Sequence, residues 1–151
     1  MVDYKYIRDH LNLNRYHNQK SRQCYAIFRS IEEFINPDEV NIFYPKNLFI
    51  EDKKIEMYVF LKGKIVICKA LEGNNIEQKI LYLKDINDFT CECYFDDEEY
   101  NYYKLILSFV NNEVIIFDTS VDTNSSWRYK LEKQLKNIVK VLIDNDSNQK
   151  Q

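Results

Sequence analysis

The strongest constraint on the fold is the succession of short β-type runs that begins at residue 40. The turns between these runs are too short for a parallel crossover, which needs a dozen residues or more, so neighbouring strands must be antiparallel. Seven runs rich in β-branched and aromatic residues cover residues 40–50, 55–61, 64–71, 76–83, 89–95, 102–110 and 113–118.

Two of the turns carry residues typical of β-hairpins. Gly63 follows Lys62 and supplies a positive φ without steric cost, and the pair Asn111-Asn112 tolerates the left-handed region. Pro45 cannot donate to a β-ladder, so the first run is expected at a sheet edge or a bend.

Alternation within the runs predicts which residues face the core. In the run 55–61 the odd-numbered residues point one way, while Glu56 and Tyr58 point the other way. The same rule places the odd-numbered residues of the run 89–95 together on one face. Cys91 and Cys93 are therefore predicted to be core residues.

Helical periodicity appears on both sides of the β-rich region. An apolar face predicts a helix over residues 18–35, which ends at Asn36-Pro37, and a shorter helix over residues 3–11. A second long helix is predicted over residues 125–143 and begins its apolar stripe with Trp127, which is expected to be buried. That stripe consists of Trp127, Leu131, Leu135, Ile138 and Leu142.

A chain of 151 residues suits one domain. We expect an N-terminal helical arm over residues 1–39 packed on the domain, a main body over residues 40–143, and a disordered tail over residues 144–151. The predicted class is α+β, a seven-stranded, strongly bent antiparallel sheet or barrel capped by the C-terminal amphipathic helix.

This order of elements, over residues 40–143, resembles a pleckstrin-homology-like (PH-like) domain. Trp127 matches the helical Trp of that family, and Ile-Leu-Tyr-Leu-Lys-Asp-Ile at residues 80–86 resembles the strand and Asp-Ile step of bacterial PH and GRAM domains. The chain also resembles small uncharacterised families of Gram-positive bacteria and their phages. The resemblance implies an adaptor, and in some members of the family a site for inositol phosphates.

The charges disfavour a phosphoinositide site. The loops expected at the barrel mouth, residues 51–54, 72–75 and 111–112, contain two Lys and three acidic residues. Binding of a multiply charged phosphate needs several aligned cationic donors. The whole chain contains only two glycines, which is too few for a Gly-rich phosphate loop. No cofactor is predicted.

Other candidate sites have structural explanations that we favour. His10 and His17 both lie in the N-terminal arm and are expected at the surface. The spacing Cys91-Glu92-Cys93 is a weak metal motif, and the four acidic residues at 96–99 are typical of a solvated turn, although they keep a metal-dependent enzyme as a third hypothesis.

Two groups of residues are candidates for contact with a partner. Arginines recur at intervals of seven, and Arg22 and Arg29 would share one helix face, but the Asn-rich residues 12–18 interrupt the stripe and disfavour nucleic-acid binding. Tyr100, Tyr102 and Lys104 would share the outward face of the sixth run, a composition common in protein contacts.

The sequence has no apolar run close to the ~20 residues of a membrane span and no signal-peptide pattern at its start, so a cytoplasmic protein with reduced thiols is expected. The leading prediction is a non-catalytic module that binds another protein or a second copy. The alternative is a small-ligand or lipid-binding protein of the START type, with a cavity beneath the long helix.

Overall fold

The computed structural model describes residues 3–13, 18–95 and 101–149. The chain forms three α-helices and seven strands in these ranges. Their order is α1 (Tyr4–Leu13), α2 (Gln19–Glu32), β1 (Ile42–Lys46), β2 (Glu56–Leu61), β3 (Lys64–Ala70), β4 (Ile76–Tyr82), β5 (Ile86–Phe95), β6 (Asn101–Phe109), β7 (Val114–Asp118) and α3 (Arg128–Gln149), with short 3₁₀ turns at Pro37–Glu39 and Leu83–Asp85.

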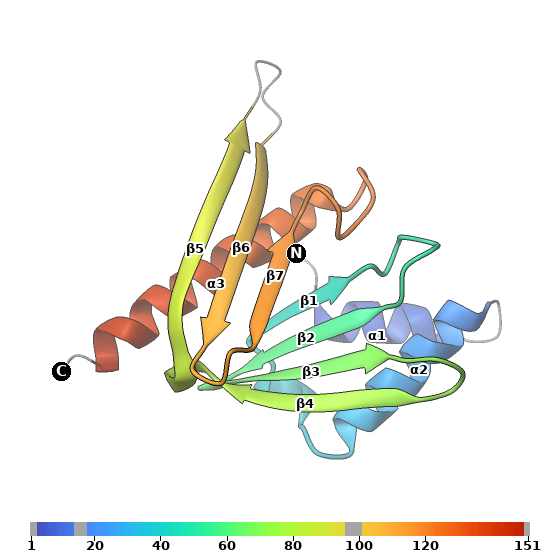
Figure 1. The fold of residues 1–151 in the computed structure, drawn as a ribbon. Helices are drawn as coiled ribbons and strands as arrows, with labels where there is room; N and C mark the ends of the chain where they lie inside the picture. The colour runs from blue at the N-terminus through green and yellow to red at the C-terminus, as the bar shows by residue number, and fades with distance from the viewer. Residues whose placement is uncertain (1–2, 14–17, 96–100, 150–151) are drawn as a thin grey trace.

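The α+β class and the seven antiparallel strands are confirmed, but the single seven-stranded sheet is wrong. Strands β1 to β4 form one sheet, and β5 to β7 form a second, three-stranded sheet that does not close with the first into a barrel. Figure 1 shows the strands of the second sheet crossing those of the first at a steep angle. Every neighbouring pair is antiparallel.

The sheets separate at the 3₁₀ turn Leu83–Asp85, the Asp-Ile step of the sequence. The amide of Leu83 donates to the carbonyl of Gly63 (3.0 Å), and the amide of Val110 donates to the carbonyl of Asp85 (2.8 Å). Leu83 is itself buried. These contacts turn the chain out of the first sheet before β5 begins, so β4 and β5 do not pair.

The four-stranded sheet is covered on both faces. On one face, Phe43 packs against Tyr4 of α1 and Phe28 of α2. On the other face, the ring of Phe117 from β7 lies 4.6 Å from that of Tyr44 and 4.8 Å from that of Tyr58. Tyr58, expected to point away from the core, is therefore buried as well.

The helix α3 lies behind the three-stranded sheet in Figure 1 and contacts β1 and β6. Its stripe is buried as predicted at Leu131, Leu135, Ile138 and Leu142. The helix continues to Gln149, beyond the predicted end at residue 143. The helix α2, in contrast, is shorter than predicted: it ends at Glu32 and not at residue 35. Phe34, just beyond its end, is 77% exposed.

Trp127 is half-buried, not buried as the stripe predicted. It precedes the first helical residue, Arg128, and its ring stacks on Phe49 of the β1–β2 loop at 4.6 Å. The Lys130 ammonium also lies over the indole, 4.2 Å from the ring centroid. The indole therefore fixes the start of α3 to a loop, not to the centre of the core.

A buried carboxylate connects the same region to β1. Asp122 accepts hydrogen bonds through Oδ2 from the Tyr44 hydroxyl (2.8 Å) and from the Asp118 amide (2.6 Å). Its backbone carbonyl accepts from the Asn47 amide (2.8 Å), and Lys46 Nζ lies 3.7 Å from Oδ1. Burial raises the pKa of Asp122, against the opposing effect of Lys46.

Replacing Asp122 with Ala should lower the free energy of unfolding by about 2–6 kcal/mol, because the buried Tyr44 hydroxyl and the part-buried Asp118 amide lose their acceptor at about 1–3 kcal/mol each. Urea unfolding measures this change. Ser120→Ala, at an exposed position in the same loop, is the matched control and should change stability by less than about 0.5 kcal/mol. Equal effects of the two substitutions would contradict the role given to Asp122.

Trp127→Ala should cost about 1–2 kcal/mol, less than the ~3–5 kcal/mol of a fully buried Trp, because only part of the indole is removed from water. As the single Trp of the chain, Trp127 reports its own environment, and its native emission should lie between the buried and exposed limits. Phe49→Ala should shift that emission to longer wavelength. A native emission at either limit would contradict the half-buried stack.

Candidate functional site

The most unusual feature of the surface is the edge strand β5. It has ten residues and pairs only with β6, at the end of the order β5-β6-β7. Its other edge has no partner strand within the described residues. Long exposed edges present unpaired N–H and C=O groups and are ready templates for another strand.

The inner face of β5 extends beyond the core. The register places Phe89 opposite Leu107 and Cys91 opposite Leu105, so these side chains share the face that β6 buries. Leu105 and Leu107 are fully buried, whereas Cys91 and Cys93 are exposed and Phe95 is 75% exposed. The predicted face is thus correct, but the predicted burial of Cys91 and Cys93 is wrong, because nothing in the described structure covers this part of the strand.

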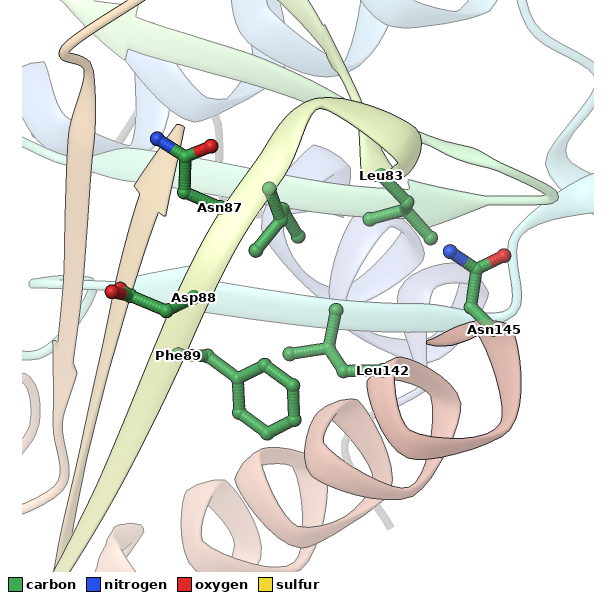
Figure 2. A pocket seen from close by; sticks show the side chains of 7 residues that line it. Leu83, Asn87, Asp88, Phe89, Leu142 and Asn145 are labelled. Atoms are coloured by element: carbon green, nitrogen blue, oxygen red, sulfur yellow. The ribbon is translucent and has the colours of Figure 1, made fainter. Parts of the chain in front are cut away.

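A hollow of about 260 Å³ lies where the start of β5 meets the end of α3. Figure 2 shows Phe89 and Leu142 pointing toward one another across it, while Asn87 and Asp88 point away from α3. The pairing of β5 with β6 shifts register between Ile86 and Asp88, which bends the strand here. The walls are Leu83, Ile86, Asn87, Asp88, Phe89, Leu142 and Asn145.

The size and lining of this hollow suit a protein side chain. Its volume is below the ~300 Å³ at which pockets for drug-sized ligands begin. Phe89 and Leu142 give it an apolar floor, and Asn87, Asp88 and Asn145 give it polar walls. Such a hollow next to a free strand edge can receive an apolar anchor residue from a partner.

Charge is distributed unevenly along β5. The strand carries Asp88 and Glu92 and has no Lys or Arg between Ile86 and Phe95. Glu92 lies opposite Lys104 of β6, on the outward face of the sheet. A partner strand that places an acidic residue directly opposite Asp88 or Glu92 would be repelled.

The four thiols divide into two classes. Burial raises the pKa of Cys24 and of Cys68 to about 12, so both are protonated near neutral pH. Cys91 and Cys93 are exposed and are not in disulfides. Partial burial and the neighbouring Cys93 raise the pKa of Cys91 more modestly. Access to reagents should therefore separate the two classes.

The predicted partner residues do not form one surface. Tyr102 and Lys104 lie on β6 opposite Tyr94 and Glu92, and Arg128 of α3 lies over the Tyr102 ring, 4.7 Å from its centroid. Tyr100 lies outside the described residues.

Arg22 and Arg29 are exposed on α2. This helix covers the face of the four-stranded sheet that points away from the three-stranded sheet, so the two arginines lie far from β6. Arg8 lies on α1, which ends at Leu13, and Arg22 lies on α2, which begins at Gln19, while Arg15 lies outside the described residues. Arg8, on α1, is engaged with Glu32 of α2 at 2.6 Å.

The loops expected to form one barrel mouth do not lie together. Lys54 of the β1–β2 loop is paired with Glu72 of the β3–β4 turn at one end of the sheet. The turn at Asn111-Asn112 lies at the other end, because the adjoining Val110 amide bonds Asp85 beside the β2–β3 turn. These residues therefore provide no common phosphate site.

No cluster of three or more His, Cys, Asp or Glu residues that could hold a metal is found in residues 3–13, 18–95 and 101–149. His10 is exposed and its ring stacks on Tyr6, whereas His17 lies outside the described residues. The four acidic residues at 96–99 also lie outside the described ranges. In the same described part of the chain, none of the helices is both long and apolar enough to cross a membrane.

A larger hollow of about 500 Å³ lies between the two N-terminal helices and the β1–β2 loop. Leu11, Cys24 and Leu48 contribute apolar surface to it. Lys20 lines the wall, where its ammonium donates to the carbonyls of Asn47 (3.0 Å) and Ile50. Burial lowers the pKa of Lys20.

The fold and its exposed strand define an α+β domain with two antiparallel sheets, an N-terminal helical layer and a C-terminal helix. The chain belongs to the family described as "Protein of unknown function (DUF3908)", whose model matches residues 3–133. Comparisons with curated proteins and with solved structures give no match.

In dilute native protein, thiol reagents should label Cys91 and Cys93 rapidly, and all four cysteines only after unfolding. The buried pair is shielded from solvent and protonated, so its reaction requires opening of the core. Mass spectrometry after a short maleimide pulse counts the labels. A Cys91→Ser, Cys93→Ser double variant should remain almost unlabelled, and rapid labelling of that variant would contradict the burial of Cys24 and Cys68.

Proposed function

We propose that this protein is a non-catalytic module that binds another polypeptide along β5. The observation that carries the proposal is β5 itself. Within the described residues it combines an edge without a partner strand, an apolar inner face that is uncovered from Cys91 to Phe95, and a side-chain-sized hollow at its start. An added strand would satisfy the edge N–H and C=O groups. Its alternate side chains would cover Cys91, Cys93 and Phe95.

Another edge strand of the described sheets, β4, is less suited to strand addition. Charged side chains protect sheet edges against pairing. Both β4 and β5 carry two of them, but on β4 Lys79 and the neighbouring Gln78 are already engaged by other elements. Lys79 is paired with Glu113 at 2.6 Å, and Gln78 accepts a hydrogen bond from Ser30 of α2 at 3.2 Å. Ile80, 49% exposed on β4, therefore provides a control position for experiments on β5.

We retain the PH-like assignment as part of this proposal. Its support is the element order, in which seven antiparallel strands in a four-stranded and a three-stranded sheet are followed by one helix. Fold-level analogy is a weak warrant for function, so the adaptor role rests on β5. Four expectations stay predictions: the lack of catalysis, the cytoplasmic location, the division of the chain into arm, body and tail, and an origin in Gram-positive bacteria or their phages.

The proposal can be tested with a displayed library of extended peptides selected against the full chain. Amide hydrogen exchange with the best peptide bound should show new protection in β5 and in the end of α3. Cys93→Lys places a charge on the inner face of β5 and should weaken binding of that peptide by about tenfold or more. Ile80→Lys should leave its affinity within about twofold of the wild-type value. Peptides that protect another surface, or that bind Cys93→Lys normally, would contradict the proposal.

A small apolar ligand is a second candidate function, favoured by the hollow between α1, α2 and the β1–β2 loop. Its volume of about 500 Å³ lies within the ~300–1,000 Å³ of ligand pockets. This hollow is not the cavity expected beneath the long helix, whose stripe packs on the sheets. Native mass spectrometry should show a co-purified ligand that Ser21→Phe, which fills the hollow, excludes. Absence of added mass, together with no displacement of an apolar fluorescent dye, would remove this candidate.

A further inference from the structure

The features of β5 point to one particular partner for this strand. We infer that it is a second copy of the same chain, joined by antiparallel β5–β5 pairing about a two-fold axis at Cys91. This inference rests on the proposed use of β5. It adds the identity of the partner and the register of the pair.

The first argument comes from where the apolar groups lie along the strand. The hollow is at the start of β5, beside Ile86 and Phe89, and the most exposed aromatic residue of the strand, Phe95, is at its end. Antiparallel pairing of two copies brings the end of each strand next to the start of the other. Each Phe95 then lies over the hollow of the opposite copy. The two-fold axis repeats this contact, so both Phe95 side chains and both hollows are covered.

The second argument comes from charge and fixes the register. A two-fold pair centred on Thr90 would set Asp88 directly opposite Glu92, and a centre at Asp88 or Glu92 would set identical acids face to face. A centre at Cys91 avoids every such contact. It places Glu92 opposite Thr90 and pairs residues 87–95 of both copies, almost the full length of Ile86–Phe95.

Centres at Phe89 or Cys93 also avoid like charges but use less of the strand. A centre at Phe89 pairs only residues 86–92, and a centre at Cys93 only residues 91–95. Neither brings Phe95 beside the hollow. The register at Cys91 is therefore the one that charge, strand length and the position of the hollow all favour.

In the inferred pair, the three-stranded sheets of the two copies join at β5 into one continuous sheet. Phe89, Cys91, Cys93 and Phe95 share one face of β5, so pairing joins these faces from both copies into one apolar strip. On the outward face, Tyr94 comes opposite Asp88 of the second copy. That neighbour distinguishes Tyr94 from Phe95, although both are strongly exposed, at 63% and 75%.

Sedimentation equilibrium over a wide concentration range tests the pair on the full chain. The wild type should be a dimer in equilibrium with monomer. Phe95→Lys removes the aromatic ring that would pack on Phe89 and Leu142 of the opposite copy, and it should raise the dissociation constant by about tenfold or more. Tyr94→Lys is the matched control, since it exchanges an exposed aromatic for Lys on the same strand but faces Asp88 of the second copy, and it should leave dimerisation equal or stronger.

Cross-linking under reducing conditions with a short bis-maleimide tests the register. The thiols at Cys91 would adjoin across the axis, whereas those at Cys93 would be separated by four positions along the strand. Cys93→Ser should therefore cross-link efficiently and Cys91→Ser should not. Cys24 and Cys68 are buried and do not compete. Circular dichroism verifies that each variant is folded, which is expected at these exposed positions.

A wild type that remains monomeric at all concentrations would overturn the inference, as would equal effects of Phe95→Lys and Tyr94→Lys. A dimer in which Cys91→Ser cross-links as well as Cys93→Ser would overturn the register. These outcomes are distinct from failure of the proposed function. A monomer whose β5 still gains protection with a selected peptide would retain the binding role and lose only the second copy as partner.

Discussion

The junction between the two sheets depends on the packing of one aromatic side chain, Phe117. Its ring from β7 meets Tyr44 and Tyr58 from two neighbouring strands of the four-stranded sheet, and Phe60 lies 6.2 Å away. Tyr44 in turn donates its hydroxyl to Asp122 just after β7. The same few residues therefore hold the second sheet on the first and set the point from which the chain leads into α3.

The exposed strand follows from this arrangement. Phe117 holds β7 over the first sheet, β6 buries Leu105 and Leu107 beside it, and β5 is the third strand out. One helix, α3, packs on the second sheet through β6, and beside β5 its Leu142 lines the same hollow as Phe89. Beyond that point the apolar alternation of β5 continues without a covering layer. A strand whose sequence has the pattern of a core strand but whose surroundings lack a core is a physical reason to look for an intermolecular contact.

Much of the architecture could be predicted from periodicity and turn residues. Gly63 and Asn112 both adopt positive φ at hairpins, Pro45 lies in the edge strand β1, and the stripe from Leu131 to Leu142 faces the core. Alternation also identified which residues of β5 share a face. It could not show whether a distant element covers that face, because cover depends on where α3 ends relative to β5. The division into two sheets was missed for a related reason: the contacts of Leu83 and Asp85 that turn the chain are long-range.

The order of the elements along the chain has a consequence for synthesis on the ribosome. The two N-terminal helices and the four-stranded sheet are encoded without interruption by residues 4–82, so this half can assemble as soon as it has left the exit tunnel. Its helical layer is then in place, but the rings of Tyr44, Tyr58 and Phe60 have no cover until Phe117 emerges. During that interval the nascent chain presents a broad aromatic surface to its surroundings. Slower elongation through the codons for β5 and β6 would prolong this exposure, so the yield of folded protein should respond to translation rate and to chaperones that hold apolar surfaces.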